Sequence, residues 1–161
     1  MKTIFAPWRM EYIRGEKPEG CIFCQDSLRT DELILFEGQT SFVMMNLYPY
    51  TSGHLLIIPF RHISQVEELL PVEKEEMFNL VDISVRVLKE ALKPDGFNIG
   101  INLGTVAGAG VDDHLHIHVV PRWCGDSNFM SVLGEVRVIP EDVSRTWEII
   151  MPYFKKYQRE D

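Results

Sequence analysis

The chain has 161 residues, of which 45% are hydrophobic, which is enough for one compact domain with its own core. Its 24 acidic and 16 basic residues give a formal net charge of −8, and it contains no basic run that could follow a nucleic-acid backbone. These values argue against a disordered chain and against polymeric nucleic acid as the main ligand. We therefore expect a single domain over residues 1–161 with one active site.

The N-terminal segment and the cysteines bear on the compartment. Met1–Glu16 mixes charged and aromatic residues and lacks the apolar core of a secretory signal, and no later window reaches membrane-spanning length. The three cysteines are Cys21 and Cys24, which two residues separate, and the isolated Cys124, and they do not form the even, dense set of a disulfide scaffold. We therefore expect a cytoplasmic protein that has no membrane partner.

The first elements predicted along the chain are three strands and a helix. The β-prone runs Leu33–Glu37 and Ser41–Met45 surround a Gly-Gln pair, which predicts a hairpin, and the apolar run Leu55–Pro59 predicts a buried strand. Apolar residues at spacings of three and four predict a helix over Pro71–Leu92, with Pro94 just beyond its end.

Two strands flank a loop in the next part of the chain. Phe97–Leu103 alternates apolar with small or polar residues and predicts a strand. The glycine-rich Gly104–Asp113 predicts a loop, and the strict alternation of His114–Val120 predicts a strand that Pro121 should end.

Helical spacing resumes over Asp142–Tyr157, where Pro152 should kink the helix or split it in two. Strands grouped with few helices indicate an α+β fold. We expect an antiparallel sheet with segregated helices.

Three histidines occupy alternate positions in the segment His114-Leu115-His116-Ile117-His118-Val119-Val120. The period of a strand puts the three imidazoles on one face, about 6.6 Å apart, and turns their branched neighbours to the core. Such a row lowers the stability of the fold, because each ring nitrogen needs a hydrogen-bond partner and the protonation of one ring opposes the protonation of the next. All five histidines lie between residues 54 and 118, which favours a shared site over solvated surface residues.

Two kinds of site fit this row. Histidines at i and i+2 can chelate zinc, with Asp112 or Asp113 completing the shell. Alternatively, the glycine-rich turn that ends at Gly110 offers backbone amides to an anion, although it lacks the Gly-Lys-Ser/Thr of a P-loop. A neutral imidazole is a competent nucleophile, and His116 has a neighbour on both sides. We favour a phosphate pocket with His116 as the nucleophile.

The Cys21-Ile22-Phe23-Cys24 segment has the spacing of a zinc knuckle, but two thiolates leave a tetrahedral shell incomplete. Two more ligands must come from elsewhere. The alternatives are an unmetallated pair of small hydrophobic residues beside Phe23 and a thioredoxin-like redox pair, which the lack of a strand-to-helix turn disfavours. We favour zinc.

The string HLHIHVV resembles the His-x-His-x-His-x-x signature of the histidine-triad (HIT) superfamily of nucleotide hydrolases and transferases. Several other segments also resemble parts of that family: Asn46 through His54, Leu55–Pro59 with His62, and Phe97–Gly104. Two further segments resemble its diadenosine-tetraphosphate-cleaving branch, which includes phosphorylases: Ala6–Ile13 and Pro121–Phe129. The resemblance implies a HIT-like fold and a small nucleotide substrate.

The resemblance implies catalytic roles for three histidines. His116 attacks the α-phosphorus to give a nucleotidyl-histidine, while His118 and His54 stabilise the phosphoryl oxygens or protonate the leaving phosphate chain. Water or inorganic phosphate then releases the nucleotide, and the sequence leaves both acceptors open.

Substrate-binding residues also follow from the resemblance. Asn46 matches a position that contacts the ribose, and Asn102 matches the segment that lines the phosphates. Gly110 and Val111 belong to the same segment, but they stand where many relatives carry a hydroxyl or amide side chain. The contacts to the leaving group are therefore left open.

The resemblance to zinc-containing HIT proteins completes the metal shell of Cys21 and Cys24 with His62 and His114. A closed four-ligand shell leaves no position for water or substrate, so its role is structural. The domain would then carry an N-terminal zinc-knuckle segment tied to the catalytic strand.

We therefore expect an enzyme that cleaves dinucleoside polyphosphates such as diadenosine tetraphosphate, and that forms a homodimer or higher homo-oligomer. A nucleoside phosphoramidate hydrolase would share the same intermediate. A nucleotide-binding sensor whose triad only holds ligand is a further alternative. A DNA-end deadenylating relative is disfavoured by the net charge of −8.

Overall fold

The computed structural model describes residues 20–24, 33–126 and 141–158. The segment Ala6–Ile13 and the end of the segment Pro121–Phe129, which carry part of the resemblance, lie outside these residues. The described elements are, in chain order, β1 (Ile34–Glu37), β2 (Ser41–Met45), β3 (Leu55–Pro59), the 3₁₀ turn η3 (Val66–Glu68), α2 (Pro71–Leu92), β4 (Gly96–Ile101), the 3₁₀ turn η4 (Thr105–Ala107), β5 (Ile117–Arg122) and α4 (Val143–Tyr157).

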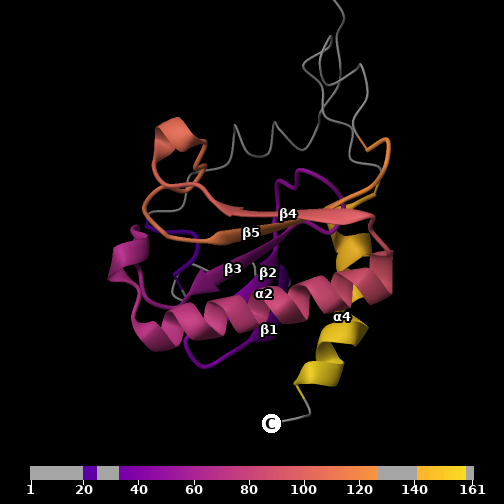
Figure 1. The fold of residues 1–161 in the computed structure, drawn as a ribbon, viewed down its shortest axis with the longest axis horizontal. Coiled ribbons are helices and arrows are strands. Elements are labelled where there is room, and N and C mark those ends of the chain that lie inside the picture. Colours follow the sequence, from indigo (N-terminus) through magenta and orange to yellow (C-terminus); the bar gives the residue numbers. More distant parts are fainter. Residues whose placement is uncertain (1–19, 25–32, 127–140, 159–161) are drawn as a thin grey trace, which may run out of the picture.

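The five strands form one antiparallel sheet in the order β1-β2-β3-β5-β4. Helix α2 runs along one face of this sheet, and α4 crosses its end beside β1 (Figure 1). The predicted α+β architecture with segregated helices is therefore confirmed.

The two faces of the sheet carry different cores. On the helix side, odd-numbered strand residues such as Val43, Ile57 and Val119 pack against Leu88 of α2 and Phe154 of α4. The opposite face carries a smaller cluster of Phe23, Phe42, Met44, Leu56 and Ile58. This alternation follows from the two-residue period of a strand.

The register of the sheet keeps even-numbered residues together on the face away from the helices. Met44 pairs with Leu56, Leu56 with His118, and Gly100 with His118. His54 immediately precedes β3 and shares this parity, so its ring and that of His118 emerge on the same face. The registers thus bring the polar side chains of His54 and His118 together on this face.

Strand β5 differs from its predicted bounds at both ends. It begins at Ile117, after two of the three histidines, and continues through Pro121 to Arg122. The carbonyl oxygen of Arg122 accepts a hydrogen bond from the amide of Asp95, which directly precedes β4. The carbonyl oxygen of Pro121 points away from β4 and accepts from Thr51 Oγ1 at 2.8 Å. Pairing with β3 ends at Val119, so the missing N–H of Pro121 breaks no ladder hydrogen bond.

The other bounds agree with the prediction or shift by a few residues. Helix α2 spans its predicted range, and β4 begins and ends earlier than the predicted Phe97–Leu103. Helix α4 is not split, because Pro152 lies on its exposed side, where solvent can bind the freed carbonyl of Glu148. Within the described ranges, neither helix combines the length and apolarity needed to cross a bilayer.

Candidate active site and metal centre

Two histidines from different strands form a hydrogen-bonded pair at the centre of the polar face. His54 Nε2 lies 2.9 Å from His118 Nδ1, and both rings are buried. The backbone amide of Tyr50 donates to His54 Nδ1 at 3.0 Å. Because an amide N–H is always a donor, Nδ1 of a neutral His54 must accept, and the ring proton is on Nε2.

This hydrogen bond determines the tautomer of the second ring as well. His54 Nε2–H donates to His118 Nδ1, so a neutral His118 carries its own proton on Nε2. His118 Nε2 is buried and has no hydrogen-bond partner among the described residues. A buried donor without a partner favours an acceptor such as a phosphoryl oxygen.

His116 is held in the opposite tautomer. Its Nδ1 lies 2.8 Å from the carbonyl oxygen of His114, which can only accept, so the proton of a neutral His116 is on Nδ1 and Nε2 keeps its lone pair. The rings of His116 and His118 touch edge to face, with centroids 4.8 Å apart. A nucleophilic nitrogen and a hydrogen-bond donor therefore stand side by side.

Burial keeps both rings neutral. Burial, and to a smaller extent the adjacent His116, lower the pKa of His118 to about 4. Burial also lowers the pKa of His116 below its usual 6.5, although the hydrogen bond to the carbonyl of His114 opposes this shift. At neutral pH, His116 is thus in the unprotonated form that a nucleophile requires.

Tyr50 completes this part of the site and was not singled out from the sequence. Its ring stacks on His118 with centroids 5.7 Å apart and 22° between the planes, and it contacts His54 at 4.6 Å. It therefore covers the histidine pair with an aromatic surface. Its place four residues before His54, in the Pro-Tyr-Thr-Ser-Gly turn, was the available signal.

The predicted substrate residues lie at different distances from the histidines. Asn46 Nδ2 is 3.3 Å from His54 Nδ1, so the structure brings Asn46 to the pair. Asn102 instead donates to the carbonyl of Gly108 at 3.4 Å, within the β4–β5 loop. Val111 packs against the cluster of apolar side chains around Phe23, and Gly110 is exposed. Their binding roles stay predictions.

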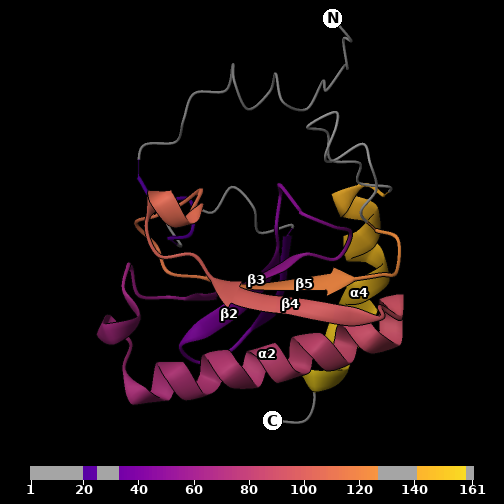
Figure 2. The same cartoon turned by 45° about the horizontal axis from the view of Figure 1, so that its top comes forward.

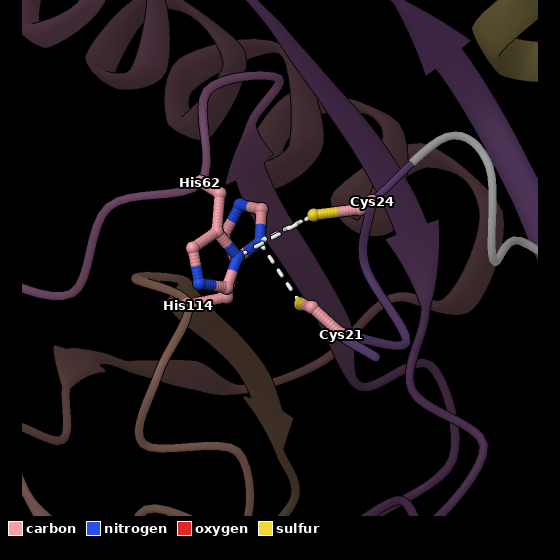
Figure 3. A group of neighbouring side chains, drawn as sticks. All are labelled: Cys21, Cys24, His62 and His114. Atoms are coloured by element: carbon pink, nitrogen blue, oxygen red, sulfur yellow. Dashed lines mark hydrogen bonds between the residues drawn. The ribbon is translucent and has the colours of Figure 1, made fainter. Parts of the chain in front are cut away.

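The four predicted metal ligands meet beside this site. The thiol and ring-nitrogen atoms of Cys21, Cys24, His62 and His114 all lie within 4.8 Å of one another. Cys21 Sγ is 3.2 Å from His114 Nδ1, and Cys24 Sγ is 3.4 Å from His62 Nδ1 (Figure 3). A tetrahedral zinc ion with ordinary bond lengths separates a sulfur from a nitrogen ligand by roughly 3.6 Å. The arrangement fits zinc.

The surroundings of His114 support the same conclusion. Its Nε2 donates to the carbonyl of Pro59 at 2.9 Å, which leaves Nδ1 without a proton and directed at the thiols. Burial raises the pKa of the Cys21 thiol to about 11, and the amide of Phe23 opposes this shift by donating to the sulfur. A bound metal ion would displace the thiol proton. The lone pair of His114 Nδ1 and the sulfur of Cys21 are thus both directed at the position that a cation would occupy.

An ion pair fixes the loop that carries the exposed His62. Arg61 donates two hydrogen bonds to the buried carboxylate of Glu73, at 2.6 and 2.7 Å. Glu73 also accepts from the amide of Leu70 at the start of α2. The carbonyl of Ile63 accepts from the amide of Leu115, so the same loop is tied to the triad segment. These contacts hold His62 opposite the cysteines.

Comparison with known proteins agrees with this geometry. A family model of the HIT domain matches residues 28–124. AP-4-A phosphorylase of Mycobacterium tuberculosis is 37% identical over 153 residues, which is 88% of this chain and 78% of the relative. Bis(5'-adenosyl)-triphosphatase of Saccharomyces cerevisiae is 31% identical over 93 residues, 57% of this chain and 45% of the relative.

A solved structure adds to the comparison. A Zn-bound histidine triad family protein from Mycobacterium smegmatis superposes with a TM-score of 0.64 at 28% identity, over 80% of this chain and 87% of that one. The fold and the alternating histidines are those of a histidine-triad protein. The chain belongs to the HIT family.

The assigned tautomers give a first prediction. In ¹⁵N-detected NMR of the folded protein, His118 should carry its proton on Nε2 and His116 on Nδ1. Because burial lowers the pKa of His118, its ring should stay neutral above pH of about 4 and take up a proton only below it. In urea, the histidines should titrate near 6.5. A folded His118 that titrates at 6.5, or carries its proton on Nδ1, contradicts the assignment.

The metal cluster gives a second prediction. The purified chain should bind one zinc ion, and Cys21→Ser should abolish this binding, whereas Cys124→Ser, at an exposed cysteine outside the cluster, should not. Zinc at about 100 times its Kd should stabilise the wild type by about 3 kcal/mol, measured by urea unfolding with and without chelator. Equal zinc contents in the two variants would disprove the site.

Proposed function

We propose that this chain cleaves dinucleoside polyphosphates, with diadenosine tetraphosphate as the substrate, through a nucleotidyl intermediate on His116. The observation that carries the proposal is that two adjacent rings have opposite tautomers: Nε2 of His116 has a free lone pair, and Nε2 of His118 carries a buried proton. The relatives named as a phosphorylase and a triphosphatase of adenosine dinucleotides support this substrate class.

The first half-reaction uses the two tautomers together. His116 Nε2 attacks the α-phosphorus, the bond to the bridging oxygen breaks, and ATP leaves with the electron pair. The Nε2–H of His118 donates to a phosphoryl oxygen on which negative charge builds up. The backbone carbonyl oxygen of His114 accepts a hydrogen bond from Nδ1–H of His116, and this bond stabilises the positive charge on the ring in the intermediate. Asn46 binds the ribose.

The second half-reaction releases the nucleotide. Inorganic phosphate attacks the phosphorus of the adenylyl-histidine, restores neutral His116 and gives ADP. We favour phosphate over water as the acceptor because similarity to the AP-4-A phosphorylase covers 88% of this chain. Asn102, Gly110 and Val111 line the phosphates in this proposal.

The metal ion in this proposal is structural zinc. Cys21, Cys24, His62 and His114 would hold it, and it would tie the knuckle to the triad segment without taking part in the reaction. The cysteines of the described residues are free, which is typical of a reducing compartment, so we place the protein in the cytoplasm.

The proposed assembly is a homodimer formed through β4. This strand is at the edge of the sheet, and the apolar side chains of Ile99 on it and of Leu103 and Val106 in the following loop are exposed. Pairing of two β4 edges would cover exposed apolar side chains of this region.

Product analysis tests the reaction. Incubation with diadenosine tetraphosphate and inorganic phosphate should give ADP and ATP, and His116→Ala should lower the rate by roughly four orders of magnitude or more, because the nucleophile is lost. Rapid quenching of the wild type without phosphate should trap a chain heavier by one adenylyl group. Retention of the zinc ion and of the unfolding temperature would show that the variant is folded.

The other outcomes separate the alternatives. AMP with ATP in the absence of phosphate would identify water as the acceptor. Cleavage of adenosine phosphoramidate alone would identify a phosphoramidate hydrolase. Absence of any adduct or turnover would leave a nucleotide-binding sensor, and a normal rate for His116→Ala would reject the nucleophile.

The assembly has its own test. Light scattering should give twice the chain mass for the wild type and the chain mass for Ile99→Lys, because a buried, unpaired charge at the β4 edge opposes association. Phe78→Lys, at an exposed position on α2, is the matched control and should stay dimeric. A monomeric wild type, or equal effects of both variants, would contradict the β4 interface.

A further inference from the structure

Phe23 connects the two parts of the site. It lies between Cys21 and Cys24, in the one described segment before β1, yet its side chain is only 5% exposed. Its ring fills a position over the sheet within the cluster that contains Met44 and Leu56. Figure 2 shows residues 20–24 beside the loop that leads into β5. The knuckle thus inserts an aromatic ring beneath the triad segment.

The Phe23 ring contacts two members of the triad. Its centroid is 5.8 Å from that of His114, at 89°, and 5.3 Å from that of His116, at 61°. His116 also touches His118, at 4.8 Å and 72°. The nucleophilic ring therefore stands against an aromatic ring from the knuckle and an imidazole from its own strand.

These contacts restrict His116 in a way that its hydrogen bond does not. The bond from Nδ1 to the carbonyl of His114 holds one ring atom, but the plane of the ring can still tilt about that atom. Contacts with Phe23 and His118 limit this tilt and so determine the direction of the Nε2 lone pair. Attack on phosphorus depends steeply on that direction.

We propose that Phe23 is a positioning residue that holds His116 in its attacking orientation and thereby couples occupancy of the metal cluster to the rate of nucleotidyl transfer. The role rests on the proposed function of His116. Binding of an ion by Cys21 and Cys24 would fix both ends of a four-residue turn, and the ring between them would be fixed with it.

The test compares two substitutions in the same turn. Phe23→Leu keeps an apolar side chain but removes the ring, and Ile22→Ala changes the neighbouring residue, which is 40% exposed. Phe23→Leu should lower kcat for diadenosine tetraphosphate by about tenfold or more and slow adenylyl-enzyme formation equally, with KM nearly unchanged. Ile22→Ala should leave both constants unchanged.

Two readouts do not depend on turnover. Zinc affinity, measured by competition with a chromophoric chelator, should be the same in Phe23→Leu and the wild type, since all four ligands remain. The ring protons of His116 should lose the ring-current shift caused by Phe23, and their NMR signals should broaden or move.

Removal of zinc tests the coupling. Chelation should lower kcat of the wild type, and it should lower kcat of Phe23→Leu by a smaller factor, because the contact that transmits the effect is already absent. Both forms are compared at a temperature at which circular dichroism shows them folded.

Four results would overturn the proposal. A raised KM with unchanged kcat would make Phe23 a substrate contact, and lost zinc affinity would make it only a support of the knuckle. Equal losses on chelation in both proteins would show that the metal acts without Phe23. If His116→Ala were active, the proposed function would fail, whereas a dead His116→Ala with a normal Phe23→Leu rejects the positioning role alone.

Discussion

Backbone groups decide which nitrogen of each imidazole carries the proton, and the chemistry of the site depends on this. The amide of Tyr50 forces the proton of His54 onto Nε2, and the resulting hydrogen bond forces that of His118 onto Nε2. The carbonyl of His114 forces the proton of His116 onto Nδ1. Neither backbone group can reverse its role, so two neighbouring histidine rings carry their protons on opposite nitrogens.

His114 links this arrangement to the metal cluster. Its carbonyl oxygen orients the ring of His116, its Nδ1 faces the thiol of Cys21, and its Nε2 donates to the carbonyl of Pro59 on β3. Movement of the knuckle would therefore shift the ring of His116 in two ways, through the backbone of His114 and through the contact with Phe23. An ion bound by this cluster would stabilise the orientation of the site rather than the bulk of the core, which lies on the other face of the sheet.

Much of the fold could be predicted from local patterns. Spacings of three and four placed α2, a β-prone run beside a hairpin signal placed β2, and a continuous apolar run placed β3, all with their observed bounds. Local rules failed where a neighbouring element decided. Pro121 was expected to end β5, but the pairing of β5 with β3 stops at Val119, so no ladder hydrogen bond needs the N–H of Pro121. Pro152 was expected to kink or split α4, but it lies on the exposed side of the helix, where solvent can bind the carbonyl of Glu148 that it frees.

The residue types of the site were determined by the sequence: three alternating histidines, a two-cysteine knuckle, and two more histidines. Resemblance to the HIT family then supplied a grouping of four metal ligands, and the structure brings those four together. Only the tertiary structure decided the tautomers, the ring of Tyr50 over the histidine pair and the ring of Phe23 against His116. These features depend on groups that strand register and loop closure bring within hydrogen-bonding or van der Waals distance, and a pattern along the chain carries no such distances.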